Sequence, residues 1–155
     1  MPFSIHTAEN AVRRLMMQGV KDRAEICFRL MLADMLHLSK YGRGISRDTY
    51  TRHGLTPTPQ KTAAMVLNAA DFDPTAYDGD YLSVSDAECL DAAVSEDGGA
   101  ARAARSAIGD TPDGCTITTE AMLRAMGEED GYIEYILEDE ALERWLSGDT
   151  DQGTD

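Results

Sequence analysis

Residues 23–42 read RAEICFRLMLADMLHLSKYG and predict a long helix in the middle of the protein. Asp22 stands at the N-cap position, with Glu25 three residues later, as in a capping box. Gly42 directly follows Tyr41 and predicts the end of the helix there. The apolar residues cover more than one face, and a helix that is apolar on most sides belongs in the core of a domain. We therefore expect the other elements to pack around this helix.

Start and stop signals predict further helices on both sides of this segment. A first helix starts behind Thr7 as N-cap and ends at Gly19. The later helices are expected at residues 59–69, at 87–94 behind Ser83 or behind Ser85 with Glu88, at 100–108, at 121–126 behind Thr118, and at 132–146. Only short pieces near Ile45 and at Tyr81-Leu82 resemble strands.

These elements predict a mostly α fold, a compact single-domain helical bundle over residues 1–147 with at most a minor short hairpin. The chain of 155 residues has the length of one ordinary domain. Residues 148–155 are rich in Asp, Gly and Thr and predict a disordered acidic tail.

Charge is divided unevenly along the chain, whose formal net charge is −14. Residues 1–61 contain ten Lys and Arg against five Asp and Glu, a net charge of +5, whereas residues 62–155 contain four Arg against 23 Asp and Glu, a net charge of −19. Direct nucleic-acid binding through the acidic part is not expected, because phosphates would be repelled. A basic partner, an acidic surface that imitates nucleic acid, and solubility alone all remain open.

The cysteines and the N-terminus indicate a cytoplasmic protein. Cys27, Cys89 and Cys115 are odd in number and widely spaced, so we expect reduced thiols. The first residues, MPFSIHTAENAVRRL, lack the apolar run of a signal peptide. No stretch approaches the roughly 18 continuous apolar residues of a membrane-spanning helix, so no membrane contact is expected.

Signals of enzyme chemistry are weak, and we predict that the protein is not an enzyme. Motifs for a serine nucleophile, a phosphate-binding loop, a zinc protease or a dinucleotide are absent from the sequence. Asp34 and His37 share a helical face, but a metal site needs three or four such groups. No catalytic residue, metal or cofactor is therefore expected, and a hydrolase or transferase without a recognisable motif is the remaining alternative.

Two stretches are candidates for binding a protein partner. The segment DGYIEYILEDEALERWL at residues 130–146 places apolar side chains on one helical stripe and acidic side chains on other faces. Trp145 near its end is either a latch onto the core or a binding anchor. The candidate contacts are a basic strip of Lys40, Arg43, Arg47 and Arg52 with Tyr41 and Tyr50, and an acidic helix with Tyr132, Tyr135, Glu138, Asp139 and Trp145.

Several segments resemble one known family. The run MLADMLHLSKYGRGISRDTY at residues 31–50 resembles the core motif of the Panacea-domain (SocA-like) antitoxins. LSVSDAECLDAAVSEDGG at residues 82–99 is similar to a later helix of that family, and GDTPDGCTITTEAML at residues 109–123 resembles its closing helix. Taken over residues 31–60 and the segment from about Leu82 onward, the resemblance covers about two-thirds of the chain.

The resemblance implies a helical antitoxin that binds and neutralises a cognate protein toxin. Some members of the family deliver the toxin to a protease, and members carried by phages are common. An alternative of a different class is a phage-encoded inhibitor of host defence, of the anti-CRISPR kind, whose acidic surface mimics nucleic acid. Binding by such a mimic should fall steeply with salt, whereas a complex with an apolar centre should lose much less.

Overall fold

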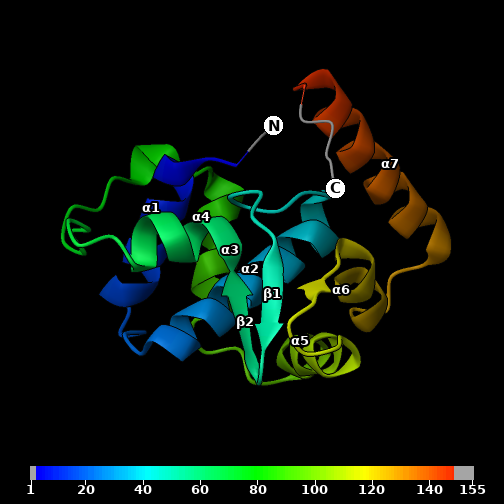
Figure 1. The fold of residues 1–155 in the computed structure, drawn as a ribbon, viewed down its shortest axis with the longest axis horizontal. Helices are drawn as coiled ribbons and strands as arrows, with labels where there is room; N and C mark the ends of the chain where they lie inside the picture. Colours follow the sequence, from blue (N-terminus) through cyan, green and yellow to red (C-terminus); the bar gives the residue numbers. More distant parts are fainter. Residues whose placement is uncertain (1–2, 149–155) are drawn as a thin grey trace.

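Helix α2 (Arg23–Tyr41) crosses the middle of the computed structural model, which describes residues 3–148 (Figure 1). Asp22 caps its start by accepting a hydrogen bond from the Glu25 backbone N–H at 3.1 Å, and Gly42 ends it with a φ of 82°. The predicted bounds of this helix are thus confirmed. Its buried residues contact α1 (Ile5–Met17), α4 (Val84–Ala93), α5 (Gly99–Asp110) and α6 (Thr119–Ala125), which confirms its central position.

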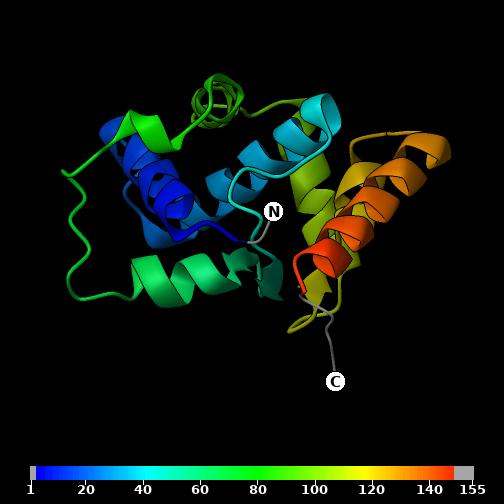
Figure 2. The ribbon, with the colours of Figure 1, turned by 90° about the horizontal axis from the view of Figure 1, so that it is seen from above.

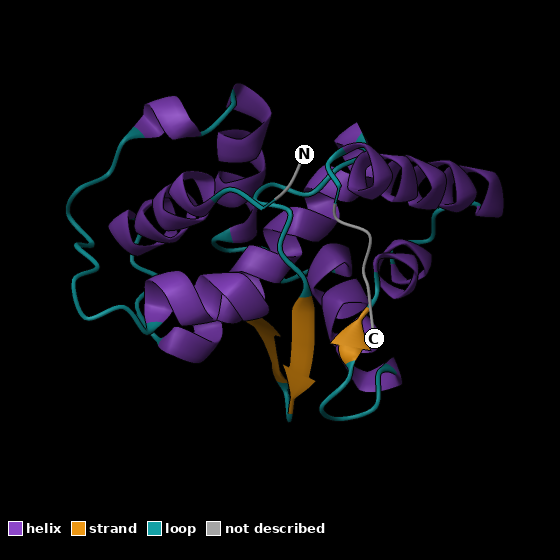
Figure 3. Ribbon diagram, turned by 45° about the horizontal axis from the view of Figure 1, so that its top comes forward, coloured by secondary structure: helices purple, strands orange, loops and turns teal. Residues whose placement is uncertain are grey.

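The remaining elements complete a mostly helical fold with a small sheet, and the predicted fold class is confirmed (Figure 3). They are β1 (Tyr50–His53), β2 (Thr56–Pro59), α3 (Gln60–Thr62) with a π-helix at Ala63–Leu67, a 3-10 helix at Gly79–Tyr81, β3 (Thr116–Ile117) and α7 (Asp130–Leu146). Figure 2 shows α7 along one edge of the molecule, on the opposite side from α1.

One predicted N-cap is wrong in position, and of the two alternatives given for another the structure uses the first. Ser4, not Thr7, caps α1, and the Thr7 hydroxyl instead donates to the Tyr81 carbonyl at 3.2 Å. Ser83 caps α4 in a full capping box with Asp86, so the pairing of Ser85 with Glu88 is not used. Thr118 caps α6 as predicted. For α1, the Ser4 hydroxyl three residues before Thr7 satisfies an N–H group of the first turn.

Two of the three strands, β1 and β2, lie in a polar stretch that contains Pro57 and Pro59, and β3 follows α5. They form an antiparallel sheet in the order β2-β1-β3, with Tyr50 opposite both Pro59 and Ile117. Gly54 opens the two-residue turn with a φ of 64°, which suits a glycine. The strand-like pieces predicted near Ile45 and Tyr81-Leu82 are wrong, because Ile45 lies in a loop and Tyr81 ends the 3-10 helix.

The short helix after β2 is capped by a residue from a distant loop. Pro59 precedes α3 and offers no side-chain hydrogen bond. The Asp48 carboxylate instead accepts from the backbone N–H groups of Thr62 at 2.7 Å and Lys61 at 3.1 Å. A carboxylate suits this place, because the N–H groups of the first turn have no partner inside the helix. Asp48 thereby ties the loop after α2 to the segment that follows the hairpin.

The Asp-rich loop at residues 68–78 is attached to α1. Asn10 accepts from the Asp78 backbone N–H at 2.7 Å, Arg13 donates to the Asp73 carbonyl at 2.8 Å, and Arg14 donates to the Tyr77 hydroxyl at 2.6 Å. This loop lies at the end of the molecule opposite to α7 (Figure 1). The basic residues of α1 are thereby engaged within the fold.

Among the described residues, no helix has the length and apolar character needed to cross a membrane. The predicted acidic tail at 148–155 falls, apart from Gly148, outside the described residues.

Replacing Asp48 by Ala should lower the free energy of unfolding by about 1 kcal/mol, the usual effect of losing a helix cap. Urea denaturation at neutral pH measures the change. Asp71→Ala is the matched control, because Asp71 is exposed in the loop and should leave the stability unchanged. Equal stabilities of the Asp48 variant and the wild type would contradict the capping role.

Candidate partner-binding surface

Helix α7 follows α6 after a short break at Gly127, whose φ is 82°. Arg124 at the end of α6 donates to the Asp130 carboxylate at 2.7 Å, across the connection between the two helices. Asp130 lies in the first turn of α7 and Arg144 in its last, which are the favourable ends of the helix dipole for these charges. The start of α7 is therefore well defined.

The inner face of α7 attaches the helix to the body of the protein. Ile133 and Ile136 are each 1% exposed, and Tyr132 and Leu137 pack partly buried beside the core. The Tyr132 hydroxyl donates to the carbonyl of Leu38 at 2.9 Å. Tyr132 was predicted to contact a partner, but its hydroxyl is used inside the fold at the end of α2.

The outer face of α7 carries four large apolar side chains that the fold leaves exposed. The exposed fractions are 65% for Tyr135, 52% for Leu142, 70% for Trp145 and 68% for Leu146. Residues seven apart return to nearly the same side of a helix, and residues three or four apart are neighbours on its surface. The four side chains therefore belong to one stripe, and Trp145 is not a latch onto the core.

Carboxylates lie within and beside this stripe. Glu134, Glu138 and Asp139 are exposed, and Glu138 and Asp139 fall between Tyr135 and Leu142 along the helix. Glu140 points to the inner side, where it accepts from the Thr119 hydroxyl at 3.2 Å and burial raises its pKa. We call the six residues Tyr135, Glu138, Asp139, Leu142, Trp145 and Leu146 the outer face of α7.

An ion pair joins α7 to the loop after α2. The Arg47 guanidinium lies 2.8 Å from both carboxylate oxygens of Glu143. Arg47 has a φ of 67°, the single positive value among the non-glycine residues that the structure describes. This backbone conformation is uncommon for a residue with a side chain. The two surfaces predicted separately, the basic strip and the acidic helix, thus meet at this pair.

The basic strip is mostly engaged within the fold. Tyr50 is 2% exposed, so its prediction as a surface contact is wrong: it begins β1, and its side chain packs in the core. Arg52 donates to the Thr111 carbonyl at 2.7 Å, and Arg43 lies 3.4 Å from the Asp86 carboxylate. Lys40 and the Tyr41 hydroxyl both donate to Glu88.

A groove of about 300 Å³ lies between α2 and α4. Leu36, Cys89 and Met126 line its apolar part, and Lys40 and Glu88 stand together at its edge. The two charges pair with each other at 3.1 Å, so the groove has no excess charge with which to select a charged partner.

His37 is fully buried and hydrogen-bonded at both ring nitrogens. Nδ1 donates to the Arg43 carbonyl at 2.7 Å, since a carbonyl only accepts. Nε2 lies 2.9 Å from the Ser85 hydroxyl and 3.2 Å from the Asp86 carboxylate. Burial raises the pKa of Asp86, but hydrogen bonds from His37 and Ser83 outweigh this effect and hold the pKa below its usual value. His37 thus joins α2, the following loop and α4.

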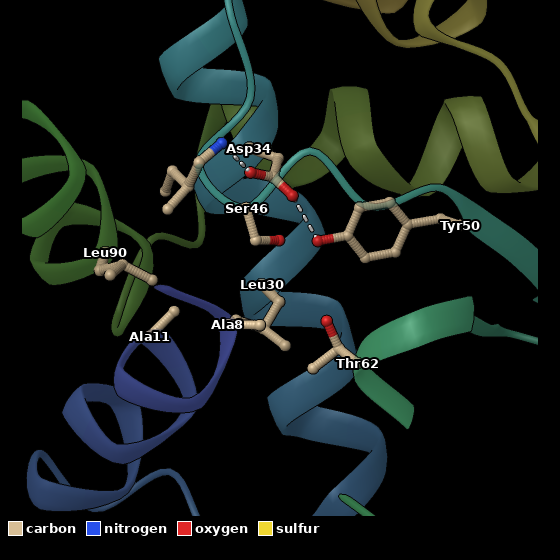
Figure 4. Close-up of a pocket in the computed structure, with 9 residues that line it drawn as sticks. Ala8, Ala11, Leu30, Asp34, Ser46, Tyr50, Thr62 and Leu90 are labelled. Atoms are coloured by element: carbon tan, nitrogen blue, oxygen red, sulfur yellow. Dashed lines mark hydrogen bonds between the residues drawn. The ribbon is translucent and has the colours of Figure 1, made fainter. Parts of the chain in front are cut away.

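Asp34 is the second polar residue buried on α2, and Figure 4 shows how its carboxylate is held. One oxygen accepts from the Ile45 backbone N–H at 2.7 Å, and the other accepts from the Tyr50 hydroxyl at 2.5 Å. Burial raises the pKa of Asp34 to about 6, although both hydrogen bonds oppose this shift. The adjoining cavity, also lined by Ser46 and Thr62, has a volume of about 10 Å³, room for no more than about one water molecule.

Within residues 3–148, no group of three or more His, Cys, Asp or Glu side chains is arranged to hold a metal ion. The cysteines Cys27, Cys89 and Cys115 are free thiols, and only Cys115 is exposed.

The outer face was found only in part from the sequence. Tyr135, Glu138, Asp139 and Trp145 were predicted as contacts, and the structure places them together. Leu142 and Leu146 were missed, although the spacing of seven from Tyr135 to Leu142 and of four from Leu142 to Leu146 indicates the same stripe.

Comparison with known proteins adds no relative. A scan against protein-family models, a search of curated proteins and a search of solved structures each found no match to this chain. The resemblance to Panacea-domain antitoxins therefore stays a prediction.

Asp34→Asn should change how stability depends on pH. The folded pKa of about 6 lies above the ordinary value of 3.8, so between these values the folded wild type holds a proton that the unfolded chain has lost. This group therefore lowers the free energy of unfolding as pH rises from about 4 to 6, by about 3 kcal/mol in all. Asn cannot titrate in this range. From pH 4 to pH 6 the free energy of unfolding of the variant should therefore rise by about 3 kcal/mol relative to that of the wild type.

Urea denaturation from pH 4 to pH 7 measures the difference in free energy of unfolding between the variant and the wild type. The contributions of all other titrating groups cancel in this difference. Asp71→Asn serves as the control, and its difference from the wild type should stay flat. A flat difference for Asp34→Asn as well would contradict the raised pKa.

Proposed function

We propose that this protein is a non-catalytic binding module of the antitoxin type, which neutralises a basic protein partner by direct binding through the outer face of α7. The observation that carries the proposal is the exposed stripe of Tyr135, Leu142, Trp145 and Leu146 with the carboxylates of Glu138 and Asp139 set within it.

The exposed apolar side chains of the outer face favour binding, because a partner would remove them from water. Large apolar side chains that gather in one exposed patch mark an interaction site more often than scattered ones do. Tryptophan and tyrosine are enriched among the residues that dominate binding energy, because they bury a large area and keep a polar group for hydrogen bonding. Trp145 and Tyr135 are the two anchors of this kind on α7.

The carboxylates of the outer face determine which kind of partner is favoured. The carboxylates of Glu134, Glu138 and Asp139 give the exposed side of α7 a negative potential. Such a potential accelerates the approach of a basic surface and repels an acidic one. Nucleic acid and anionic membranes are therefore disfavoured, and a basic protein is favoured.

The antitoxin class rests on the resemblance of residues 31–50 and 82–99 to Panacea-domain antitoxins. In the structure these residues form most of α2, the start of β1, and α4, which are parts of the central scaffold. The outer face of α7 lies beyond the three quoted segments, the last of which ends at residue 123. The scaffold would then be common to the family, and α7 would select the partner of this particular chain.

An inhibitor of host defence that mimics nucleic acid is the second candidate, and the acidity of residues 62–155 favours it. The two candidates differ in what the partner contacts. A mimic would present spread carboxylates to a basic groove, whereas an antitoxin would bury the apolar stripe. Delivery of the bound toxin to a protease belongs to the first candidate.

Trp145→Ala should weaken the complex with the partner by about 2 kcal/mol, the loss expected for a central anchor. The measurement is affinity capture from the native host, followed by titration of the captured protein by calorimetry. Leu55→Ala is the matched control, because Leu55 is 85% exposed in the turn between β1 and β2, which lies away from α7 (Figure 1). Equal affinities of the folded Trp145 variant and the wild type would remove α7 from the interface.

Salt separates the two candidates. Raising the salt concentration from 50 to 200 mM should weaken an apolar-centred antitoxin complex only several-fold, since screening reduces only its rim charges. A mimic that replaces six or more phosphates should lose about a thousandfold or more over the same range. The second result would favour the inhibitor and contradict the antitoxin.

A further inference from the structure

We infer that the outer face of α7 is occupied by a basic amphipathic helix of the partner, which lies along α7 and places a Lys or Arg over Glu138 and Asp139. This inference rests on the proposed function and names the part of the partner that α7 recognises.

The spacing of the outer face suits a helix as its occupant. Tyr135, Glu138, Leu142 and Trp145 follow one another at intervals of three, four and three residues. This alternation keeps side chains on one side of a helix, in a row that runs nearly straight for about 15 Å. The matching surface of a second helix is a row with the same alternation, so two helices can interdigitate along their full contact.

The position of α7 leaves room for such an occupant. Figures 1 and 2 show α7 along an edge of the molecule. Its attachments, through Ile133, Ile136 and the Arg47–Glu143 ion pair, lie away from the centre of the outer face. A partner helix can therefore approach the stripe without displacing these contacts.

The order of side chains defines the chemistry of the occupant. Along α7 the outer face is apolar at Tyr135, acidic at Glu138 and Asp139, and apolar again from Leu142 to Leu146. A purely apolar helix would bury the two carboxylates without partners, which costs several kcal/mol for each unpaired charge. A basic residue at the middle of the occupant, with apolar residues one turn to each side, removes this penalty.

A second copy of this chain fits the outer face poorly. Two α7 helices packed against each other in antiparallel orientation would place Glu138 of each copy near Leu142 of the other, without a basic partner. The exposed carboxylates of Glu134 and Asp139 would also repel their counterparts. The charges of the outer face therefore oppose self-association and favour a basic helix.

The test uses the full chain and a synthetic helical peptide of about 20 residues, roughly five to six turns. Its contacting row has Leu at alternating spacings of three and four, with one Lys at the middle position of the row, and Lys or Arg occupies the other faces. A scrambled peptide has the same composition but no apolar face. Trp145 is the single tryptophan of the chain, so its fluorescence reports directly on the outer face. We expect saturable binding and a blue shift of the emission with the amphipathic peptide, and neither with the scrambled one.

The double variant Glu138→Gln/Asp139→Asn should bind the amphipathic peptide at least about tenfold more weakly, because it loses its close charge pairs. Asp71→Asn/Asp80→Asn is the matched control: it removes two exposed carboxylates at the opposite end of the molecule and should bind as the wild type does. Circular dichroism of both variants verifies that the fold is intact.

Equal binding of the two peptides, or equal effects of the two double variants, would overturn the inference, because general electrostatic attraction would then explain the result. A blue shift that grows with protein concentration without peptide would overturn it in favour of a second copy. Absence of binding by both peptides would also overturn it. If the native partner nevertheless depended on Trp145, the proposed function would stand and only the helical occupant would be wrong.

Discussion

The buried carboxylate of Asp34 fixes the path of the chain after the central helix. It accepts one hydrogen bond from the backbone of Ile45 and one from the hydroxyl of Tyr50, and so holds both the loop and the first strand against α2. His37, one turn further along, holds the carbonyl of Arg43 in the same way. Because buried polar groups are costly without partners, the loop has little freedom to leave this position. The sheet and the contacts of α7 with the loop follow from it.

This constraint explains why the basic strip is not an open surface. The loop that Asp34 and His37 hold carries Arg43 towards Asp86 and Arg47 towards Glu143. The excess positive charge of residues 1–61 is therefore largely balanced by acidic groups from later in the chain. The remaining acidic residues are left in excess on the surface, and the carboxylates of α7 are among them. The division of charge along the sequence thus becomes a negative outer surface in the folded protein.

Local signals predicted the helices well because each depends on nearby residues, as Asp22 and Gly42 show for α2. The prediction allowed a short hairpin but did not locate it, because Pro57 and Pro59 usually argue against a strand. Pro57 and Pro59 are tolerated here because β2 is an edge strand, where a proline ring costs no ladder hydrogen bond on its open side. Tyr50 was predicted on the surface because nothing in the neighbouring sequence indicates burial. Its burial depends on a contact distant in sequence, the hydrogen bond from its hydroxyl to Asp34. On α7, spacing identified the aromatic residues, but burial was needed to separate the inner face from the outer one.

The outer face also explains how the free chain tolerates exposed aromatic residues. An apolar stripe without charges would pair with its own copy, since burying it is favourable wherever a second stripe is available. The carboxylates of Glu134, Glu138 and Asp139 raise the energy of pairing between two copies. They lower the energy of a complex with a partner that brings positive charges. In the proposed complex the apolar side chains would supply the attraction, and the acidic ones the choice of partner. A single helix would then both oppose self-association and present the proposed binding surface.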